Sequence, residues 1–176
     1  MRFVEFLRAT VVLTAAAASA LGVLAVLVAA PTGRSTLLLA TLGWWVLAVA
    51  LGLWLGRRQQ ASPAIARLLA RAKASPALPS EQPGTILLNR LWPLLAVTIL
   101  AGALALVAPQ VPGIGAGFAI AGALAWRRQH AAVAAIEKRD GVCFYVLRTS
   151  PLQPIALQRT PGFKSPAPDA RGRALP

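Results

Sequence analysis

Four long apolar stretches without a charged residue restrict what this chain can fold into. At about 1.5 Å per helical residue, the first is long enough to cross the roughly 30 Å of hydrocarbon in a bilayer. Short turn segments with Pro and Gly separate the first stretch from the second and the third from the fourth. The pattern predicts an all-α integral membrane protein, a four-transmembrane-helix bundle made of two helical hairpins. The expected spans are about 9–30, 36–56, 91–108 and 112–126.

The composition excludes an ordinary soluble domain. Hydrophobic residues make up 57% of the 176 residues and charged residues 13%, whereas soluble domains have about 25% charged residues. One cysteine rules out an internal disulfide or a Cys-rich zinc site. A cleaved signal peptide is an alternative for the first stretch. Arg2 and Arg8 would form its basic N-terminal region, and Ala18-Ser19-Ala20 has the small-residue pattern of a cleavage site. A retained span is favoured, since apolar sequence continues ten residues past Ala20.

Cationic residues are divided very unevenly between the segments that connect the stretches. Of 18 Lys and Arg residues, two precede the first stretch, six lie in the central loop, nine follow the fourth stretch, and the two hairpin turns hold only Arg34. Basic flanks stay on the cytoplasmic side, so we predict a multi-pass protein of the cell membrane with both termini in the cytoplasm. Trp54, Trp92 and Trp126 fall at the expected cytoplasmic ends, where indole rings are enriched.

The net charge of +13 is explained by this topology and by anionic lipid headgroups, which attract each nearby Lys or Arg by about 1 kcal/mol. We therefore expect anionic membrane lipids on the cytoplasmic side as partners. Nucleic acid is not expected, because no basic segment is interleaved with stacking aromatics. The arginines predicted to contact headgroups are Arg57, Arg58, Arg67, Arg71, Arg127 and Arg128.

Composition shifts divide the chain into five parts. A polar loop with a Pro-rich linker separates the two transmembrane hairpins, and a third region with a helix extension and strands precedes a disordered tail. The parts are 1–58, 59–90, 91–128, 129–159 and 160–176.

A short amphipathic helix is predicted over 63–73 in the central loop. Ser62 is a good N-cap, and Pro63 suits the first helical position. Apolar residues from Ile65 to Ala72 recur at helical spacing, while Arg67 and Arg71 project from the opposite face. Such a helix can lie in the membrane interface with its arginines towards headgroups, or it can pack on the protein's own cytoplasmic hairpin. Pro93, by contrast, is expected in the first turn of the third span.

Beyond Trp126 the helix is expected to continue to Asp140 and to end at Gly141. Two strand-like runs at 142–148 and 155–159 then predict a small cytoplasmic β-hairpin that is apolar on both faces. Two strands are marginal alone, so this hairpin needs a cover. We expect a docking surface for a protein partner or a second copy of the chain, or else folding back on Ile65 and Leu68. The docking residues are Phe144, Tyr145, Val146, Leu147, Ile155 and Leu157.

Small residues recur every fourth position in the second and fourth spans. Such ridges let helix backbones approach closely, within the bundle or towards a partner, and packing within the bundle is favoured. A phosphate-binding loop is excluded, because no strand precedes the glycines. Two mid-span tryptophans, Trp44 and Trp45, are assigned to packing, with a wall for an apolar ligand as the alternative. The packing residues are Gly52, Gly56, Gly113, Gly117, Ala121 and Ala125.

Residues that could carry chemistry are few. The four stretches contain no Asp, Glu, Lys, Arg or His, which argues against an ion pathway. Cys143 is expected to be a packing residue, His130 a solvated one, and Glu137 and Asp140 members of exposed ion pairs. No cofactor and no metal are expected. We predict a non-enzymatic accessory or interaction component of the cytoplasmic membrane; the alternatives are a carrier for an uncharged or lipid-like substrate, and an enzyme acting on headgroups.

Overall fold

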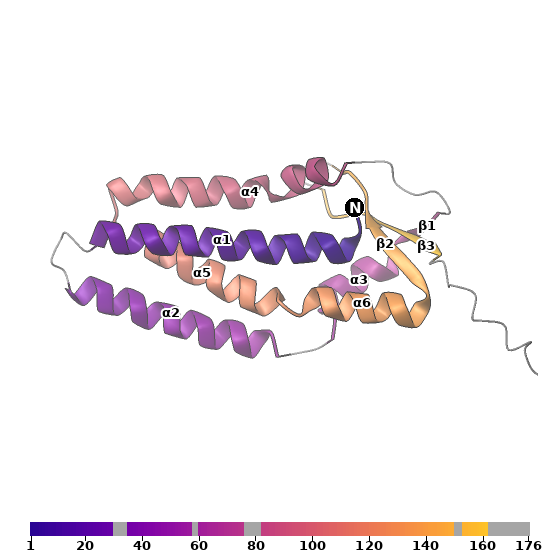
Figure 1. The fold of residues 1–176 in the computed structure, drawn as a ribbon, viewed down its shortest axis with the longest axis horizontal. Helices are drawn as coiled ribbons and strands as arrows, with labels where there is room; N and C mark the ends of the chain where they lie inside the picture. Colours follow the sequence, from indigo (N-terminus) through magenta and orange to yellow (C-terminus); the bar gives the residue numbers. More distant parts are fainter. Residues whose placement is uncertain (30–34, 58–59, 76–81, 150–152, 162–176) are drawn as a thin grey trace, which may run out of the picture.

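The structure is a computed structural model that describes residues 1–29, 35–57, 60–75, 82–149 and 153–161 (Figure 1). It is mostly helical, with a small sheet of three strands. The elements are α1 (Phe3–Ala29), α2 (Ser35–Leu55), α3 (Pro63–Ala70), β1 (Lys73–Ala74), α4 (Pro83–Ala103), a 3₁₀ turn (Leu104–Leu106), α5 (Val111–Trp126), α6 (Gln129–Asp140), β2 (Val142–Val146) and β3 (Leu157–Pro161).

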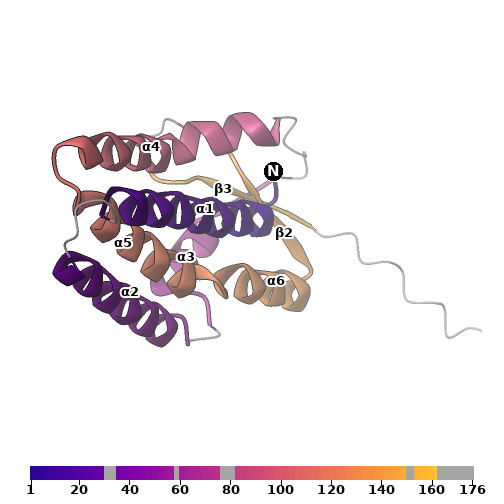
Figure 2. The ribbon, with the colours of Figure 1, turned by 60° about the vertical axis from the view of Figure 1, so that its left-hand side comes forward.

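Within the residues that the structure describes, three helices are long and apolar enough to cross a membrane. They are α1, the Thr36–Leu55 part of α2, and the Pro83–Leu106 segment that α4 forms with the 3₁₀ turn. By length and composition the chain therefore has the build of a multi-pass membrane protein. With 16 residues α5 is shorter, yet it lies alongside α1 and α2 (Figures 1 and 2).

The third apolar helix begins earlier than the sequence indicates. It starts at Pro83, not near 91, and Pro93 lies inside the helix, not in its first turn. The polar residues Asn89 and Arg90, which favoured a loop, are helical. Their side chains donate hydrogen bonds to the segment between β2 and β3. These tertiary hydrogen bonds thus offset the free-energy cost of keeping the polar start of α4 helical.

The expected unbroken helix from 112 to 140 is wrong. It breaks at Arg127 and Arg128: α5 ends at Trp126 and α6 begins at Gln129, with Arg128 at its N-cap (φ −100°, ψ −7°). The backbone N–H of Ser62 donates to the side-chain carbonyl of Gln129 over 2.9 Å, which joins α6 to the start of α3. The break lets α6 turn towards α1 and β2. Gly141 ends α6 at φ 64°, the left-handed conformation for which glycine was expected.

The sheet has three strands in the order β1-β3-β2, so the predicted two-stranded hairpin is incomplete. β2 and β3 are antiparallel as predicted, but β1 adds a parallel pairing with β3. Helix α3 therefore ends at Ala70, and Lys73 is in a strand instead of the helix expected to reach 73. On the far edge, the backbone N–H of Val146 donates to the carbonyl of Met1 over 3.0 Å.

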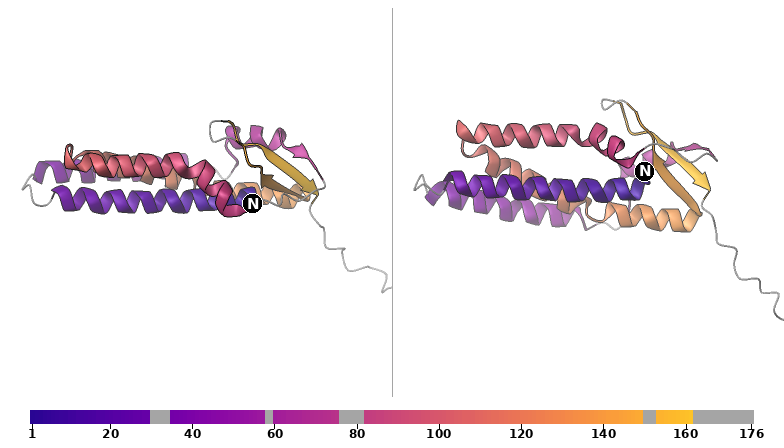
Figure 3. Two further views of the ribbon diagram at one scale, coloured as in Figure 1. Left: turned by 90° about the horizontal axis from the view of Figure 1, so that it is seen from above. Right: turned by 45° about the horizontal axis from the view of Figure 1, so that its top comes forward.

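The sheet lies beside the N-terminal end of α1 (Figure 3), and a core of buried side chains joins it to the helices there. We call this part the sheet module: residues 1–7, the start of α4, and α3, α6 and the sheet. Ile65 is 2% exposed, so the apolar face of α3 is covered by the chain itself. The core consists of Phe3, Phe6, Leu7, Ile65, Ile86, Val133, Phe144, Val146 and Leu157.

The helical part beyond the module is layered around α5. It packs most closely against α1 and α2, which make few contacts with each other. Helix α4 lies on the other side of α1 (Figure 2). The order across the bundle is therefore α4, α1, α5, α2.

Candidate functional site

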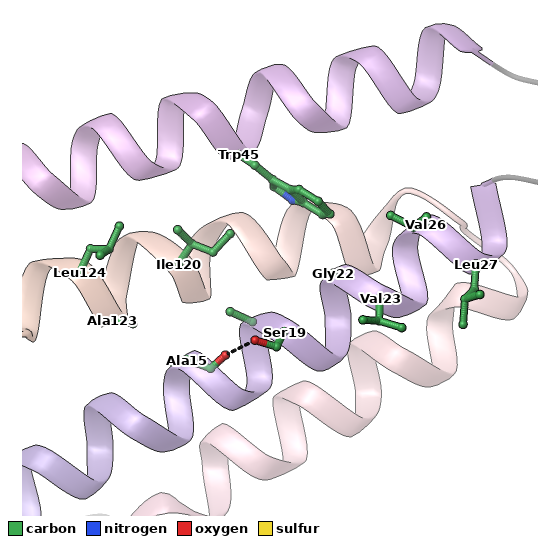
Figure 4. Close-up of a pocket in the computed structure, with 11 residues that line it drawn as sticks. Ala15, Ser19, Gly22, Val23, Val26, Leu27, Trp45, Ile120, Ala123 and Leu124 are labelled. Atoms are coloured by element: carbon green, nitrogen blue, oxygen red, sulfur yellow. Dashed lines mark hydrogen bonds between the residues drawn. The ribbon is translucent and has the colours of Figure 1, made fainter.

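A groove of about 680 Å³ opens between α1, α2 and α5 (Figure 4). Its floor comes from α5 through Ile120 and Leu124, and one wall from α1 through Ser19 and Gly22. Trp45 projects from α2 into the gap and faces Gly22. The lining is almost wholly apolar, and the groove exists because α1 and α2 are held apart by α5.

The indole groups of the two neighbouring tryptophans tie α2 to α5. Trp45 donates its Nε1–H to the carbonyl of Gly113 over 2.8 Å, and Trp44 donates to that of Ile114 over 3.2 Å. Trp44 also meets the ring of Phe118 edge-on, with the centroids 5.2 Å apart. Packing thus accounts for both side chains, while Trp45 in addition forms part of the groove wall.

The small residues singled out in the sequence face one another across the same helix pair. A Cβ atom added at Gly52 would lie 2.9 Å from the carbonyl oxygen of Ala121, and one at Gly56 would meet the carbonyl oxygen of Leu124. A Cβ at Gly113 would lie 2.9 Å from Cγ2 of Thr41. Gly117 lies under the ring of Trp44, and Ala125 is half-buried on α5. These ridges are occupied within the chain.

Three arginines come together where α2 ends and α5 turns into α6. Arg128 donates to the carbonyl of Arg57 over 3.4 Å. Arg127 lies beside Arg128, and its Nε is buried without a hydrogen-bond partner. Among the described residues, no acidic side chain forms a salt bridge with any of the three. We call Arg57, Arg127 and Arg128 the arginine cluster.

The other predicted headgroup arginines lie elsewhere. Arg67 and Arg71 are exposed on α3 in the sheet module, on the side opposite to Ile65. Arg58 falls outside the described residues. The fold therefore brings only part of the predicted set to one place.

The predicted docking residues are largely used inside the chain. Phe144, Val146 and Leu157 are buried in the core with Ile65. The cover that the hairpin needs is therefore supplied for these three residues by the chain itself, and the alternative of folding back on Ile65 and Leu68 describes the packing. The other three docking residues, Tyr145, Leu147 and Ile155, are half-buried.

Glu137 is a buried link and not part of an exposed ion pair. It is 5% exposed, and its carboxylate accepts hydrogen bonds from the guanidinium of Arg2 over 2.7 Å and from the backbone N–H of Phe144 over 2.9 Å. The hydrogen bond and charge of Glu137 raise the pKa of Arg2. Sequence spacing gave no signal for this contact, since 135 residues separate the partners.

The remaining candidates for chemistry stay apart from the groove. Asp140 pairs with Arg139 on the surface over 2.7 Å, which lowers the pKa of Asp140. Cys143 is a free, half-buried thiol on β2, and Nδ1 of His130 is buried without a partner. In the described part of the chain, no three His, Cys, Asp or Glu side chains gather as a metal site would require.

A second apolar groove, of about 510 Å³, separates α1 from α4. Ala16 and Ala20 line it from α1, and Trp92 and Leu95 from α4. Neither groove was predicted from the sequence. Two signals were present: the alternative interpretation of Trp45 as a wall for an apolar ligand, and the run of alanines in α1, which leaves too little side-chain volume to fill the space between helices.

Comparisons with known proteins assign no relative to the chain. No family model matches it, and neither a curated protein nor a solved structure is significantly similar.

Proposed function

We propose that this chain is a non-enzymatic accessory component of the cytoplasmic membrane that holds a rigid cationic module at the membrane surface. The observation that carries the proposal is the way the sheet module is fixed to the apolar helices. Phe3 and Ile86, from the starts of α1 and α4, are part of its core. The module therefore cannot move independently of these helices, and its exposed arginines keep one orientation to the bilayer.

We propose α5 as the fourth span. It lies between α1 and α2, and it is contacted directly by Gly52 of α2 and by Gly56, which follows the end of α2. Its 16 residues cover about 24 Å, roughly 6 Å less than the hydrocarbon thickness. Local bilayer thinning and the long side chains of Arg127 and Arg128 can accommodate such a difference.

The orientation we propose has both termini and the sheet module in the cytoplasm. It is supported by the fold, because the charged residues of the described ranges all lie in the module, at its junction with the helices or in the first turns of α1 and α4. In a Cys143→Ser background, cysteines at Arg34 and Gln110 should react with an impermeant thiol reagent from outside. Cysteines at Gln60 and Arg148 should not. Labelling of Gln60 from outside would overturn the orientation.

The exposed side of α3 is the surface we propose for partners. Arg67, Arg71 and Lys73 are exposed there, and no described acidic residue pairs with them. Such a face suits anionic headgroups or an acidic surface of a protein partner or second copy. Nucleic acid is not part of the proposal.

The test uses the full chain purified in mild detergent. Changing Arg67 and Arg71 to Glu should release bound protein or lower the oligomeric state, measured by light scattering and mass spectrometry. Changing Lys138 and Arg148 to Glu is the matched control for charge reversal and should leave the assembly intact. A wild-type protein that is monomeric and carries no other protein at low salt would contradict the accessory role.

A carrier for a lipid-like substrate is the second candidate, and the 680 Å³ groove favours it. A pocket of this size is within the range of small-molecule sites. An enzyme acting on headgroups has less support, because the carboxylate of Glu137 is already engaged by Arg2 and Phe144.

A further inference from the structure

We propose that the groove between α1, α2 and α5, together with the arginine cluster, binds one phospholipid with an anionic headgroup. The acyl chain would lie in the groove and the phosphate at the arginines. This goes beyond the accessory role, since it concerns a defined lipid site and not the partner surface on α3.

The groove and the cluster meet at Leu124. This residue lines the groove, and its carbonyl oxygen is in contact with Gly56, which precedes Arg57. Arg127 follows Leu124 by three residues, or about 4.5 Å of helix. One molecule with an apolar tail and a charged end can therefore reach both.

The dimensions of the groove fit a lipid chain. On α1 its lining runs from Ala15 to Leu27, about 18 Å of helix. One leaflet contributes about half of the roughly 30 Å of hydrocarbon. An extended acyl chain of that leaflet therefore has the length of this wall. Because the walls are apolar, an acyl chain that enters the groove replaces other lipid chains and not bound water.

The charge at the inner end favours an anionic headgroup over a zwitterionic one. The arginine cluster has no acidic partner among the described residues, and Nε of Arg127 is buried without an acceptor. The side chains of Arg57 and Arg128 are exposed and can donate to the oxygens of a phosphate. Trp54 and Trp126 are exposed beside the cluster, at the depth where indole rings contact headgroups.

The second groove lacks this polar end. Leu91 lines it, but the neighbouring Arg90 already donates to Gln153 and Pro154 of the segment between β2 and β3, over 2.6 and 3.2 Å. The groove between α1 and α4 is therefore expected to contain acyl chains without preference for their headgroups. This difference supplies the controls.

The experiment measures the shift in unfolding temperature when phosphatidylglycerol or phosphatidylcholine is added to the full chain in detergent. Wild type should gain more from phosphatidylglycerol. Changing Arg57 and Arg127 to Gln should weaken phosphatidylglycerol binding about thirtyfold, because each cation near an anionic surface contributes about fivefold. The same change at Lys138 and Arg148, which are exposed away from the groove and from the partner surface on α3, removes equal charge and should have little effect.

Filling the groove tests the acyl chain. Ser19→Phe should remove the extra shift with phosphatidylglycerol, whereas Ala20→Phe, which faces the other groove, should keep that extra shift. Ser19→Leu serves if the larger ring prevents folding. Soluble glycerophosphoglycerol should produce no shift. Equal shifts of wild type with both lipids, or a full shift in a folded Ser19 variant, would overturn the site. Neither result bears on partners bound through Arg67 and Arg71.

Discussion

Helices α5 and α4 both flank α1, but they are held in opposite ways. Helix α5 contacts both α1 and α2 along its length, and the close approach at Gly52 and Gly56 brings the backbones of α2 and α5 together. α4 leaves a groove against α1 and is fixed mainly at one end, where Ile86 enters the core and Asn89 and Arg90 bind the segment between the strands. The comparison shows that close packing along the whole length of a helix is not required to position it in this bundle.

The difference follows from the solvent. Lipid is as apolar as Leu, so apolar area alone gives no strong drive for helices to associate within the bilayer. Close backbone approach and indole hydrogen bonds supply that drive for α2 and α5. α4 has neither among the described contacts. It is held instead by the contacts that its first turns make with the sheet module and with the segment between β2 and β3.

The largest expected effect comes from blocking the close approach at α5. Gly56→Leu would drive a side chain into the carbonyl of Leu124, so we expect a loss of about 3 kcal/mol or failure to fold. Thermal unfolding in detergent measures it. Gly43→Leu is the matched control, because a Cβ at Gly43 meets nothing within 4 Å. Equal stability of the two variants would mean that α5 is not held by this contact.

Releasing the anchored end of α4 should come next. Arg90→Met removes the donors to Thr149, Gln153 and Pro154, and hydrogen bonds to charged groups are worth about 1.5–3 kcal/mol each when buried. The Arg90 side chain is partly exposed, so we expect about 2 kcal/mol in total. Faster proteolysis between β2 and β3 would accompany the loss. Arg148→Met, at an exposed position, should leave both properties unchanged.

A smaller effect is expected from the indole hydrogen bonds. Trp45→Phe keeps an aromatic ring but removes the donor to Gly113, and hydrogen bonds between membrane helices average about 0.6 kcal/mol. Trp54→Phe is the control, because Trp54 is 63% exposed. If both variants unfold at the wild-type temperature, the indole contribution to the α2–α5 pair is negligible.

The smallest effect is expected on the groove side of α4. Leu95 is 54% exposed in the protein, so lipid can take the place of the lost side-chain atoms in Leu95→Ala. The expected change is below about 0.5 kcal/mol, as is usual for surface positions. A loss of 2 kcal/mol or more would show that α4 packs against α1 as tightly as α5 does.

The sequence predicted the features that depend on local pattern. Uncharged runs located α1 and α2, Ser62 and Gly141 marked the helix ends they cap, and β-formers located β2. The features it missed depend on distant residues. β1 is two residues long and exists only because β3 lies beside it, and Glu137 is buried because Arg2 reaches it.

Some local signals were overridden. Asn89 and Arg90 belong to a polar stretch that favours a loop, but their bonds to the segment after β2 keep them helical. Among the residues singled out for a site, the glycines and Trp45 could be selected by spacing and type. The groove they border could not, because it depends on where α5 holds two other helices apart.

The position of α5 has a consequence for synthesis. Helices α1 and α2 are synthesised first, yet they touch little, and α5, which joins them, begins at Val111, about 56 residues after α2 ends at Leu55. At about 5–20 residues per second, the first two helices wait on the order of ten seconds in the bilayer. During that interval the indole N–H groups of Trp44 and Trp45 have not met Gly113 and Ile114. A nascent chain stalled before α5 thus leaves both indole donors without the carbonyl partners that they have in the finished protein.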